Sequence, residues 1–413
     1  MFLIYKFVYI QICIYICKIK KDAMINNITG SPVEGNNFFG REKELKYVWS
    51  HIQKGNSIIL SAPRRVGKSS LAKKIIKQAN AAEWNTMEIN LEEIKSEEGF
   101  LKVFIKELQK QDWWEKAKSK SSDLIESLLS GIKLSGEMFG VKGSFEYQKQ
   151  KEDSYDNLKK LLNHGEETLI MVDELTVLLN SLIESDPVNG KKNAEFFLNW
   201  LRSFRQVSGT KIRWIFCSSI GIDNFTSQHN LSHTFNDVDP YPIGAFKIEK
   251  AKELLSELAK SDQIILSEEI IDYKLNKLGW LLPYFIQILF FKFYHLIQVE
   301  DREITTDTVD EAYNLLISEK HLNTWEERLH EYNELENYAR ELLKRLSNNK
   351  QGESRSVLVS FLNTKINDPE KSDSTLSKLL YMLQNDGYLI EEELKYSFRS
   401  PLLRDFWYNR FSK

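Results

Sequence analysis

The segment 61–70, SAPRRVGKSS, has the residue types and spacing of a loop that binds phosphate groups. An apolar run precedes it and a helical pattern follows, so successive backbone N–H groups converge at a helix N-terminus. In such a loop Lys68 reaches the β and γ phosphates, the Ser69 hydroxyl ligates Mg²⁺, and Gly67 lets the backbone approach closely. Ala62 stands where these loops usually begin with glycine. A chance Gly-Lys-Ser in a surface turn is the alternative, and it agrees less well with the flanking strand and helix.

A second motif, LIMVDEL at 169–175, ends an apolar run with two carboxylates. Because ligands of a parallel α/β sheet bind at the carboxyl ends of its strands, we expect both carboxylates beside the loop. Asp173 would then contribute to the Mg²⁺ site, and Glu174 would polarise an attacking water. The other loop residues that we assign to nucleotide binding are Pro63, Arg64, Arg65, Val66 and Ser70, with solvent exposure as the alternative for the two arginines.

Three further polar residues are candidates for the catalytic step. Ser219 ends the next expected strand in CSSI (217–220) and could contact the γ-phosphate or orient the water, with Ser218 as the neighbouring choice. Arg202 and Arg205 lie three residues apart on one helix face and could stabilise charge in the transition state. The structural alternatives are a serine turn and a solvated basic face, and we favour the basic face for both arginines.

Short apolar runs alternate with helical patterns, which predicts an α/β fold with a parallel sheet of the P-loop NTPase type. An insertion over about residues 95–160 separates the second strand from the third. Its middle, 132–147, alternates apolar and polar residues around glycines like a hairpin, and we assign it no chemical role. We expect strands at 57–63, 86–90, 168–174, 211–219 and 241–248, with a helix over 68–78.

After the sheet the pattern becomes wholly helical and then changes again. Three helices closed by an extended segment are the order of a winged helix. We expect helices at 248–260, 267–276, 281–298 and 307–318, then at 333–347, 355–363 and 373–385, with an extended segment over 387–407. The expected domains are a P-loop ATPase domain over 24–247, a helical lid over 248–325 and a winged helix over 330–413.

The leader, residues 1–23, begins with 17 residues that are apolar apart from Lys6 and Gln11. This length falls below the ~20 residues of a comfortable membrane span. We favour translation from Met24, then a membrane anchor, and last a signal peptide, because no small-residue cleavage site follows the apolar run. Lysines after that run would hold the remaining chain on the cytoplasmic side, so we expect a cytoplasmic protein.

The composition excludes several classes of protein. The 413 residues allow two to four domains, and a hydrophobic content of 42% is ample for packed cores. With 56 basic and 59 acidic residues the chain is not a general polyanion binder, and it is neither fibrous nor disordered. The three cysteines, Cys13, Cys17 and Cys217, and seven scattered histidines predict neither a disulfide framework nor a zinc site.

Together these motifs resemble the archaeal-type P-loop ATPases, which belong with the AAA+ and STAND groups and are related to origin-recognition initiators. The resemblance implies ATP and Mg²⁺ as ligands and an adenine contact by Phe39, Gly40 and Arg41. From the residues alone, that segment is an aromatic-Gly-Arg turn before a helix, with a capping role as the alternative. The matching segments, found between Asn26 and Lys413, are FFGREKEL (38–45), SAPRRVGKSSL (61–71), LIMVDEL (169–175), CSSI (217–220), the helical region and YSFRSPLLRDFW (396–407).

The sequence departs from the family pattern in the helical region. The family carries Gly-x-Pro near the nucleotide, and here Leu281 stands two residues before Pro283, the nucleotide contact that the pattern implies. Residues 281–298 contain no arginine, so the sensor-2 arginine of AAA+ motors is absent. A STAND-type switch therefore fits better than a ring-forming motor.

These observations predict an ATP-binding, slowly hydrolysing, Mg²⁺-dependent switch whose nucleotide state is coupled to the helical and winged-helix domains. An ATP-licensed DNA-binding regulator or initiator-like loader is the alternative function. A membrane-tethered scaffold without nucleotide chemistry is a third. We expect a protein partner at the winged helix or the insertion, and an oligomer is left open.

The charges of the C-terminal region bear on DNA binding. Residues 331–413 hold 13 basic and 13 acidic side chains, the expected recognition helix offers only Lys378, and the expected wing holds three consecutive glutamates. Phosphate neutralisation requires several cations on one face, so protein contact or nucleotide-state sensing is favoured over DNA. Arg399, Arg404 and Arg410 could still form a local basic patch.

Overall fold

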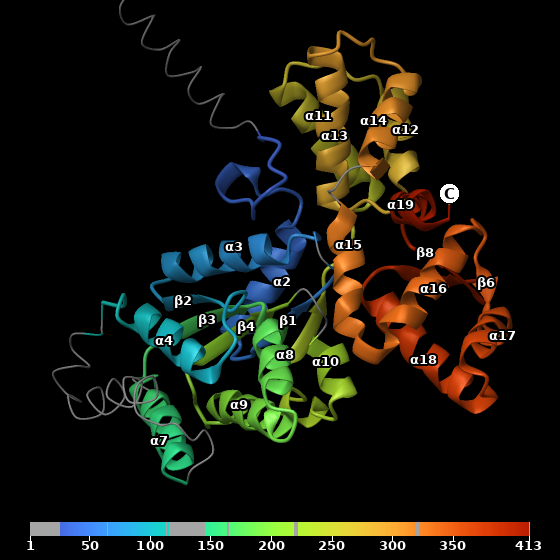
Figure 1. Ribbon diagram of the computed structural model, residues 1–413. Coiled ribbons are helices and arrows are strands. Elements are labelled where there is room, and N and C mark those ends of the chain that lie inside the picture. Colours follow the sequence, from blue (N-terminus) through green and yellow to red (C-terminus); the bar gives the residue numbers. More distant parts are fainter. Residues whose placement is uncertain are drawn as a thin grey trace, which may run out of the picture. The chain divides into compact units, whose positions relative to one another are not determined.

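The computed structural model describes most of the chain from residue 25 onward (Figure 1). The described residues are 25–63, 65–112, 114, 145–162, 165–218, 222–318 and 322–412. Contacts divide them into two compact units. The sheet unit consists of residues 42–62 and the described residues between 68 and 243. The helical unit consists of the described residues before 42, those between 63 and 67, and those after 243. The apolar leader lies outside the described residues.

A five-stranded parallel sheet forms the centre of the sheet unit. Its strand order is β2-β3-β4-β1-β5, and every neighbouring pair is parallel. β3 and β4 are buried along almost their whole length, as expected for strands covered on both faces. The parallel α/β fold that the sequence predicts is therefore confirmed. The strands are β1 (Ile58–Ser61), β2 (Asn85–Asn90), β3 (Thr168–Asp173), β4 (Ile212–Cys217) and β5 (Asp239–Pro242).

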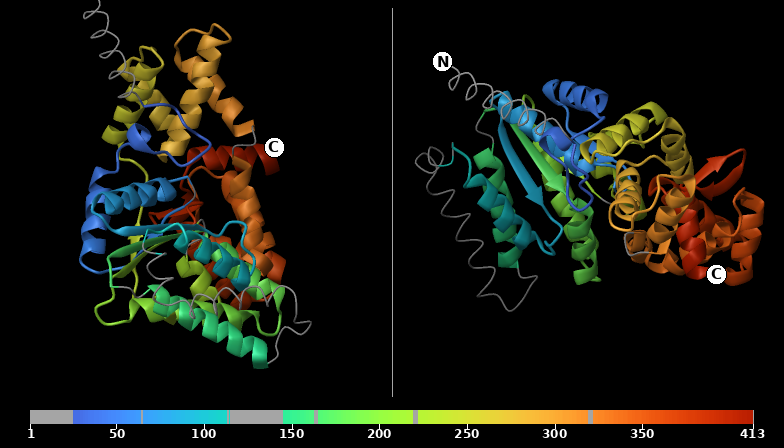
Figure 2. Two further views of the ribbon diagram at one scale, coloured as in Figure 1. Left: turned by 90° about the vertical axis from the view of Figure 1, so that its left-hand side faces the viewer. Right: turned by 90° about the horizontal axis from the view of Figure 1, so that it is seen from above.

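Helices cover both faces of this sheet (Figure 1, Figure 2). One face carries α2 and α3, and the opposite face packs on a core of aromatic rings from α4, α7 and α9 and leucines from α8. In that core the ring centroids of Phe100 and Phe197 are 4.8 Å apart and those of Tyr155 and Trp200 4.5 Å. These pairs join helix to helix, and Phe204 of α9 packs on Trp214 of β4 with ring centroids 5.7 Å apart, so the same core also contacts the sheet. The helices are α2 (Glu42–Gln53), α3 (Lys68–Ala81), α4 (Glu97–Leu108), α7 (Phe145–Leu162), α8 (Leu175–Ser185), α9 (Gly190–Arg205), α10 (Ile222–Gln228) and the 3₁₀ turn η2 (Ser232–Thr234).

Two sequence predictions for this unit need correction. The fifth strand ends at Pro242 and does not continue to residue 248. Pro240 and Pro242 lack the N–H groups that a central strand needs, which confines β5 to the sheet edge. Of the hairpin expected over 132–147, residues 132–144 lie outside the described residues, and residues 145–147 begin the helix α7.

The helices expected over 248–318 are present in the helical unit. Their boundaries differ from the predicted ones by one or two residues. In α13, for example, the helix begins at Pro283, because proline at the first helical position loses no hydrogen bond. Among the residues that the structure describes, none of the helices is long and apolar enough to cross a membrane. The helices are α11 (Ile248–Ser261), α12 (Glu268–Leu278), α13 (Pro283–Gln298) and α14 (Thr306–Ser318).

The C-terminal part of this unit follows the order helix, strand, helix, helix, strand, strand. Its three strands form an antiparallel sheet in the order β6-β8-β7. The assignment of this segment as a winged helix stays a prediction. The elements are α16 (Glu336–Ser347), β6 (Glu353–Ser354), α17 (Arg355–Ile366), α18 (Pro369–Asn385), β7 (Leu389–Glu392) and β8 (Lys395–Phe398), preceded by α15 (Asn323–Glu327) and the 3₁₀ segment η4 (Arg328–Leu335).

The extended segment predicted over 387–407 is wrong in its last part. The chain forms a further helix, α19 (Pro401–Phe411), directly after β8. Ser400 caps this helix by accepting a hydrogen bond from the Leu403 N–H at 3.4 Å, and Pro401 takes the first helical position. The apolar side chains of α19 are buried at helical spacing, which a strand would not provide.

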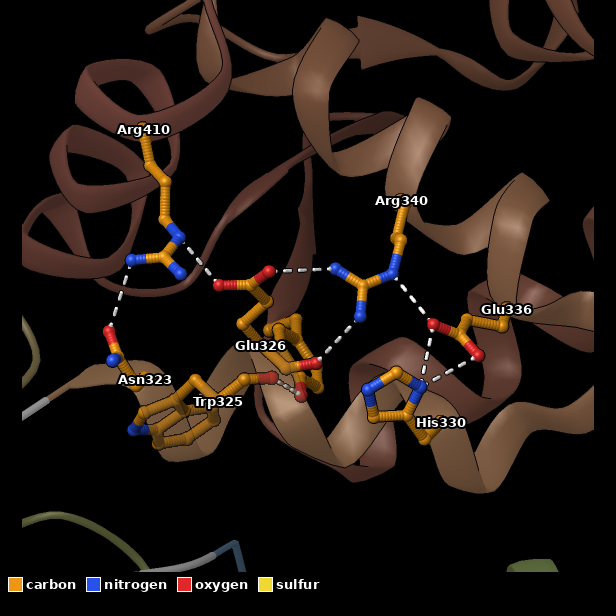
Figure 3. Close-up of polar contacts among 8 residues, drawn as sticks. Asn323, Trp325, Glu326, His330, Glu336, Arg340 and Arg410 are labelled. Atoms are coloured by element: carbon orange, nitrogen blue, oxygen red, sulfur yellow. Dashed lines mark hydrogen bonds and ion pairs between the residues drawn. The ribbon is translucent and has the colours of Figure 1, made fainter. Parts of the chain in front are cut away.

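Ion pairs join the segment 323–335 to α16 and α19, as Figure 3 shows. Arg340 contacts Glu326 at 3.2 Å and Glu336 at 2.8 Å, and Glu336 also contacts the His330 ring at 2.9 Å. Arg410 of α19 contacts Glu326 at 2.6 Å. Because these charges share partners, they form a network that fixes the segment to the C-terminal helices.

Lys274 of α12 lies in an unusual environment for a charged group. Its side chain is buried, its Nζ atom has no hydrogen-bond partner, and Nζ lies 3.1 Å from the centroid of the Phe293 ring. Desolvation lowers the pKa of Lys274 well below its ordinary value. Burying this amine therefore opposes folding at neutral pH.

We expect Lys274→Met to raise the free energy of unfolding at pH 7 by about 2 kcal/mol, because an apolar side chain of similar length replaces an unpaired amine. The unfolded chain holds a proton on Lys274 that the folded chain releases, so wild-type stability rises with pH up to about 10.4. The gain should accordingly shrink as the pH rises. Urea unfolding at several pH values measures it.

Lys277 on the same helix is the matched control, because its Nζ is paired with Asp310 at 2.7 Å. Lys277→Met should bring no gain. A Lys274→Met protein less stable than wild type at pH 7 would contradict the prediction.

Candidate functional site

The chain leaves β1 after Ser61 and enters α3 at Lys68. Lys68 is buried, and its Nζ donates a hydrogen bond to the Ala62 carbonyl at 2.7 Å, across the base of the loop. Gly67 has φ +101°, a conformation that favours glycine over any other residue. Ser70 is buried in the first turn of α3. A lysine, a glycine and the start of a 14-residue helix thus occur together at the carboxyl end of β1, as a phosphate loop requires.

Ser69 and Asp173 are in direct contact. The Ser69 hydroxyl donates a hydrogen bond to Asp173 Oδ2 at 2.9 Å, and the Glu174 N–H donates to Asp173 Oδ1 at 3.1 Å. Burial raises the pKa of Asp173, an effect that the Ser69 hydrogen bond and the Lys68 charge oppose and the Glu174 charge reinforces. The structure therefore places a desolvated carboxylate, a hydroxyl and a lysine at one corner of the sheet.

Glu174 adopts a left-handed backbone conformation, with φ +56° and ψ +39°. A residue with a Cβ is strained there, at a cost of about 1 kcal/mol or more. Glu174 immediately precedes α8, so the strained residue forms the junction between β3 and that helix. Such strain is typical of functional positions, where the surrounding structure fixes an otherwise unfavourable geometry.

The end of β4 contributes a buried hydroxyl pair. Ser218 is buried and shares a hydrogen bond with Thr176, which lies in the first turn of α8. Ser219 lies outside the described residues. The sequence analysis did not single out Thr176, although a threonine two residues after the Asp-Glu pair was a visible signal. Cys217 is buried beside these groups, and burial raises the pKa of its thiol.

Arg205 is bound inside the sheet unit. Its guanidinium donates hydrogen bonds to both Asp237 carboxylate oxygens, at 2.8 and 3.0 Å, and to the Thr234 carbonyl at 2.7 Å. Arg202 lies 3.8 Å from the same Asp237. Only 3% of the Arg205 side chain is exposed. Arg205 therefore differs from the solvated basic face that we favoured, because its side chain is buried against the Phe216 and Phe235 rings and pairs with Asp237, which reaches the solvent.

By its contacts, the middle of the loop, within residues 63–67, belongs to the helical unit. The residues on either side of it, Ala62 and Lys68, belong to the sheet unit. The guanidinium carbon of Arg65 lies 4.5 Å from the centroid of the Tyr284 ring. Tyr284 directly follows Pro283 in the sequence. Pro63 lies so close to Gly387 that a Cβ added there would be 2.6 Å from Pro63 Cγ. Arg64 lies outside the described residues.

The expected adenine-binding segment also belongs to the helical unit. Phe39 packs edge-on against Phe246, with ring centroids 6.3 Å apart. Gly40 has φ +74°, and a Cβ there would meet Phe246 and Lys250 at 3.0 Å. Arg41 is buried against the same Phe246 ring, 4.6 Å from its centroid. The structure thus brings these three residues of the motif together around one aromatic side chain.

Because the buried Arg205 side chain donates hydrogen bonds to Asp237 and to the Thr234 carbonyl, we expect Arg205→Ala to lower the free energy of unfolding by about 2 kcal/mol. Arg202→Ala is the control and should change it by less than about 1 kcal/mol, since Arg202 is more exposed and farther from Asp237. Chemical denaturation of the two variants measures both values. An Arg205→Ala protein as stable as wild type would refute the structural role.

No protein-family model and no curated protein matches this chain. Among solved structures, one described as the Walker-type ATPase PABY2304 of Pyrococcus abyssi is 15% identical and has a TM-score of 0.59, with 92% of this chain and 99% of that chain covered. The ORC2 protein of Aeropyrum pernix, described as ADPNP and ADP complexes, is 12% identical with a TM-score of 0.51, covering 92% and 98%. The chain therefore has the P-loop fold of these archaeal proteins along most of its length.

Proposed function

We propose that this protein binds ATP with Mg²⁺ and hydrolyses it slowly. The contact between Ser69 and Asp173, with Lys68 beside it, carries this proposal. β1 and β3 both flank β4, so parallel pairing brings the loop after β1 and the carboxylate after β3 to the same edge. The Aeropyrum pernix relative is described as ADPNP and ADP complexes, which supports the same class of ligand here.

The donor groups fit a nucleotide and a hard cation. Ser69 and Asp173 offer a hydroxyl and a carboxylate, which are ligands that Mg²⁺ accepts alongside phosphate oxygens. Among the described residues no cluster of three or more His, Cys, Asp or Glu could hold a metal alone, so this pair would act together with the nucleotide. Bound Mg²⁺ would neutralise charge on the β and γ phosphates.

The residues of the chain then take separate roles. Lys68 would exchange the Ala62 carbonyl for a phosphate oxygen, because both are hydrogen-bond acceptors within reach of Nζ. Glu174 would hold the attacking water and accept its proton. Ser219 would contact the γ-phosphate. Arg202 would stabilise the negative charge of the transition state, because Arg205 is held by Asp237. Phe39, Gly40 and Pro283 would border the adenine.

We further propose that nucleotide state is transmitted through the loop to a helical lid (248–325) and a winged helix (330–413). The contacts of Pro63 with Gly387 and of Arg65 with Tyr284 support this route, because both partners belong to those segments. A loop that rearranges on hydrolysis would change both contacts, and the two segments would re-angle in response.

Several cations of the proposed winged helix are engaged by carboxylates inside the helical unit, which speaks against a DNA-binding function. Each of the following ion pairs removes a cation from the set available to phosphates. The pairs are Arg345 with Glu353, Arg355 with Asp373, Lys365 with Glu341, Arg404 with Asp405, and Arg410 with Glu326. A protein partner therefore fits this surface better than a nucleic acid.

Two substitutions separate binding from turnover. Lys68→Ala should weaken ATP binding at least about 100-fold, because the charged donor to the phosphates is lost. Glu174→Gln should leave binding nearly unchanged and reduce turnover at least about 100-fold, because the amide cannot accept a proton. Calorimetric titration and a phosphate-release assay measure the two effects.

Lys77→Ala on the exposed side of α3 and Glu184→Gln on α8 are matched controls that should behave like wild type. An unaltered ATP affinity in the Lys68→Ala protein would disprove the phosphate-loop assignment.

We expect no gel shift of duplex DNA at 50 mM salt with ATP and Mg²⁺ present, because residues 331–413 hold as many acidic as basic side chains, 13 of each. A retarded band that weakens steeply with added salt would instead favour the DNA-binding alternative. Fluorescence anisotropy with a labelled duplex checks the result in solution.

A further inference from the structure

Arg41 contacts the phosphate loop itself. One terminal nitrogen of its guanidinium donates hydrogen bonds to the Gly244 carbonyl at 2.7 Å and to the Val66 carbonyl at 3.2 Å. The Arg41 side chain is buried, with 5% of the residue exposed, and it lies on the Phe246 ring. It thereby ties the turn before α2 to the loop and to the segment that follows β5.

The bond to Val66 has a consequence for the next residue. A trans peptide is planar, so the carbonyl of one residue and the N–H of the following residue point in opposite directions. A donor that fixes the Val66 carbonyl therefore also fixes the direction of the Gly67 N–H. That N–H belongs to the group of loop donors that a phosphate would use. Because Gly67 has no Cβ, its backbone alone would allow this peptide other orientations.

The neighbouring residues explain how Arg41 reaches this place. Gly40 is packed so tightly that a Cβ would approach both Lys250 and Phe246 to 3.0 Å, and its positive φ turns the chain there. Phe39 remains half-buried, with its ring 5.3 Å from Lys250 Nζ and edge-on to Phe246. Within this motif the ring of Phe39 is the group suited to a base, and the guanidinium nitrogen on the two carbonyls is already engaged.

We infer that Arg41 is a positioning residue for the phosphate loop and does not read the adenine ring. It orients the Val66–Gly67 peptide so that the Gly67 N–H faces the phosphates. This inference rests on the proposed ATP-binding function. It assigns Arg41 a different role from the adenine contact that the family resemblance implies.

Nucleotide selectivity tests the inference. Dissociation constants for ATP and GTP are measured by calorimetry for the full chain and its Arg41→Ala and Arg41→Lys variants. Arg41→Ala should weaken both nucleotides by the same factor, about tenfold, and leave their ratio at the wild-type value. Arg41→Lys retains one donor and should recover part of the loss for both. A Phe39→Leu control should change the ratio, because it removes the ring offered to the base.

The possible results are distinguishable. A loss confined to ATP, or unchanged affinity for both nucleotides, would overturn the inference. Should Arg41→Ala fail to fold, Arg41→Lys provides the same comparison of ratios. A wild-type protein that binds neither nucleotide would refute the proposed function instead.

Discussion

The hydrogen bond between the Ser69 hydroxyl and the Asp173 carboxylate is the contact on which the candidate site depends. It joins residues 104 positions apart, so only the sheet can bring them together. β4 separates β1 from β3, and parallel pairing aligns the carboxyl ends of all three strands. The aromatic core supports this arrangement, because Phe204 of α9 packs on Trp214 of the central strand β4 with ring centroids 5.7 Å apart.

The phosphate loop has two sets of constraints. Its ends are continuous with β1 and α3, whereas its middle contacts residues of the helical unit: Arg41 at Val66, Tyr284 at Arg65, and Gly387 at Pro63. Arg65 has φ +66°, which is unfavourable for a residue with a Cβ. A loop held in a strained conformation by distant residues can respond to a ligand by changing those contacts, which is the property that a nucleotide-dependent switch needs.

The C-terminal region uses its charges internally. Arg340, Glu326 and Arg410 connect the segment 323–335 to α16 and α19, and a buried pair joins Arg328 to Asp386 at 3.3 Å. Asp386 directly precedes Gly387, the residue beside Pro63. In the switch that we propose, these contacts would transmit a displacement at the loop to the C-terminal elements. The same pairs reduce the number of cations available to a polyanionic partner.

The sequence by itself determined the strands of the parallel sheet, the phosphate loop and the Asp-Glu pair, because apolar periodicity, glycine placement and motif spacing are local properties of the chain. It misplaced the end of β5 and missed α19, where proline and capping positions outweighed the expected pattern. Only the tertiary structure decided the partners of the polar side chains: Asp237 for Arg205, Ser218 for Thr176, and the loop carbonyl for Arg41. The physical reason is that a buried charge or hydroxyl bonds to whatever the fold brings within 3 Å, and that neighbour is usually distant in sequence.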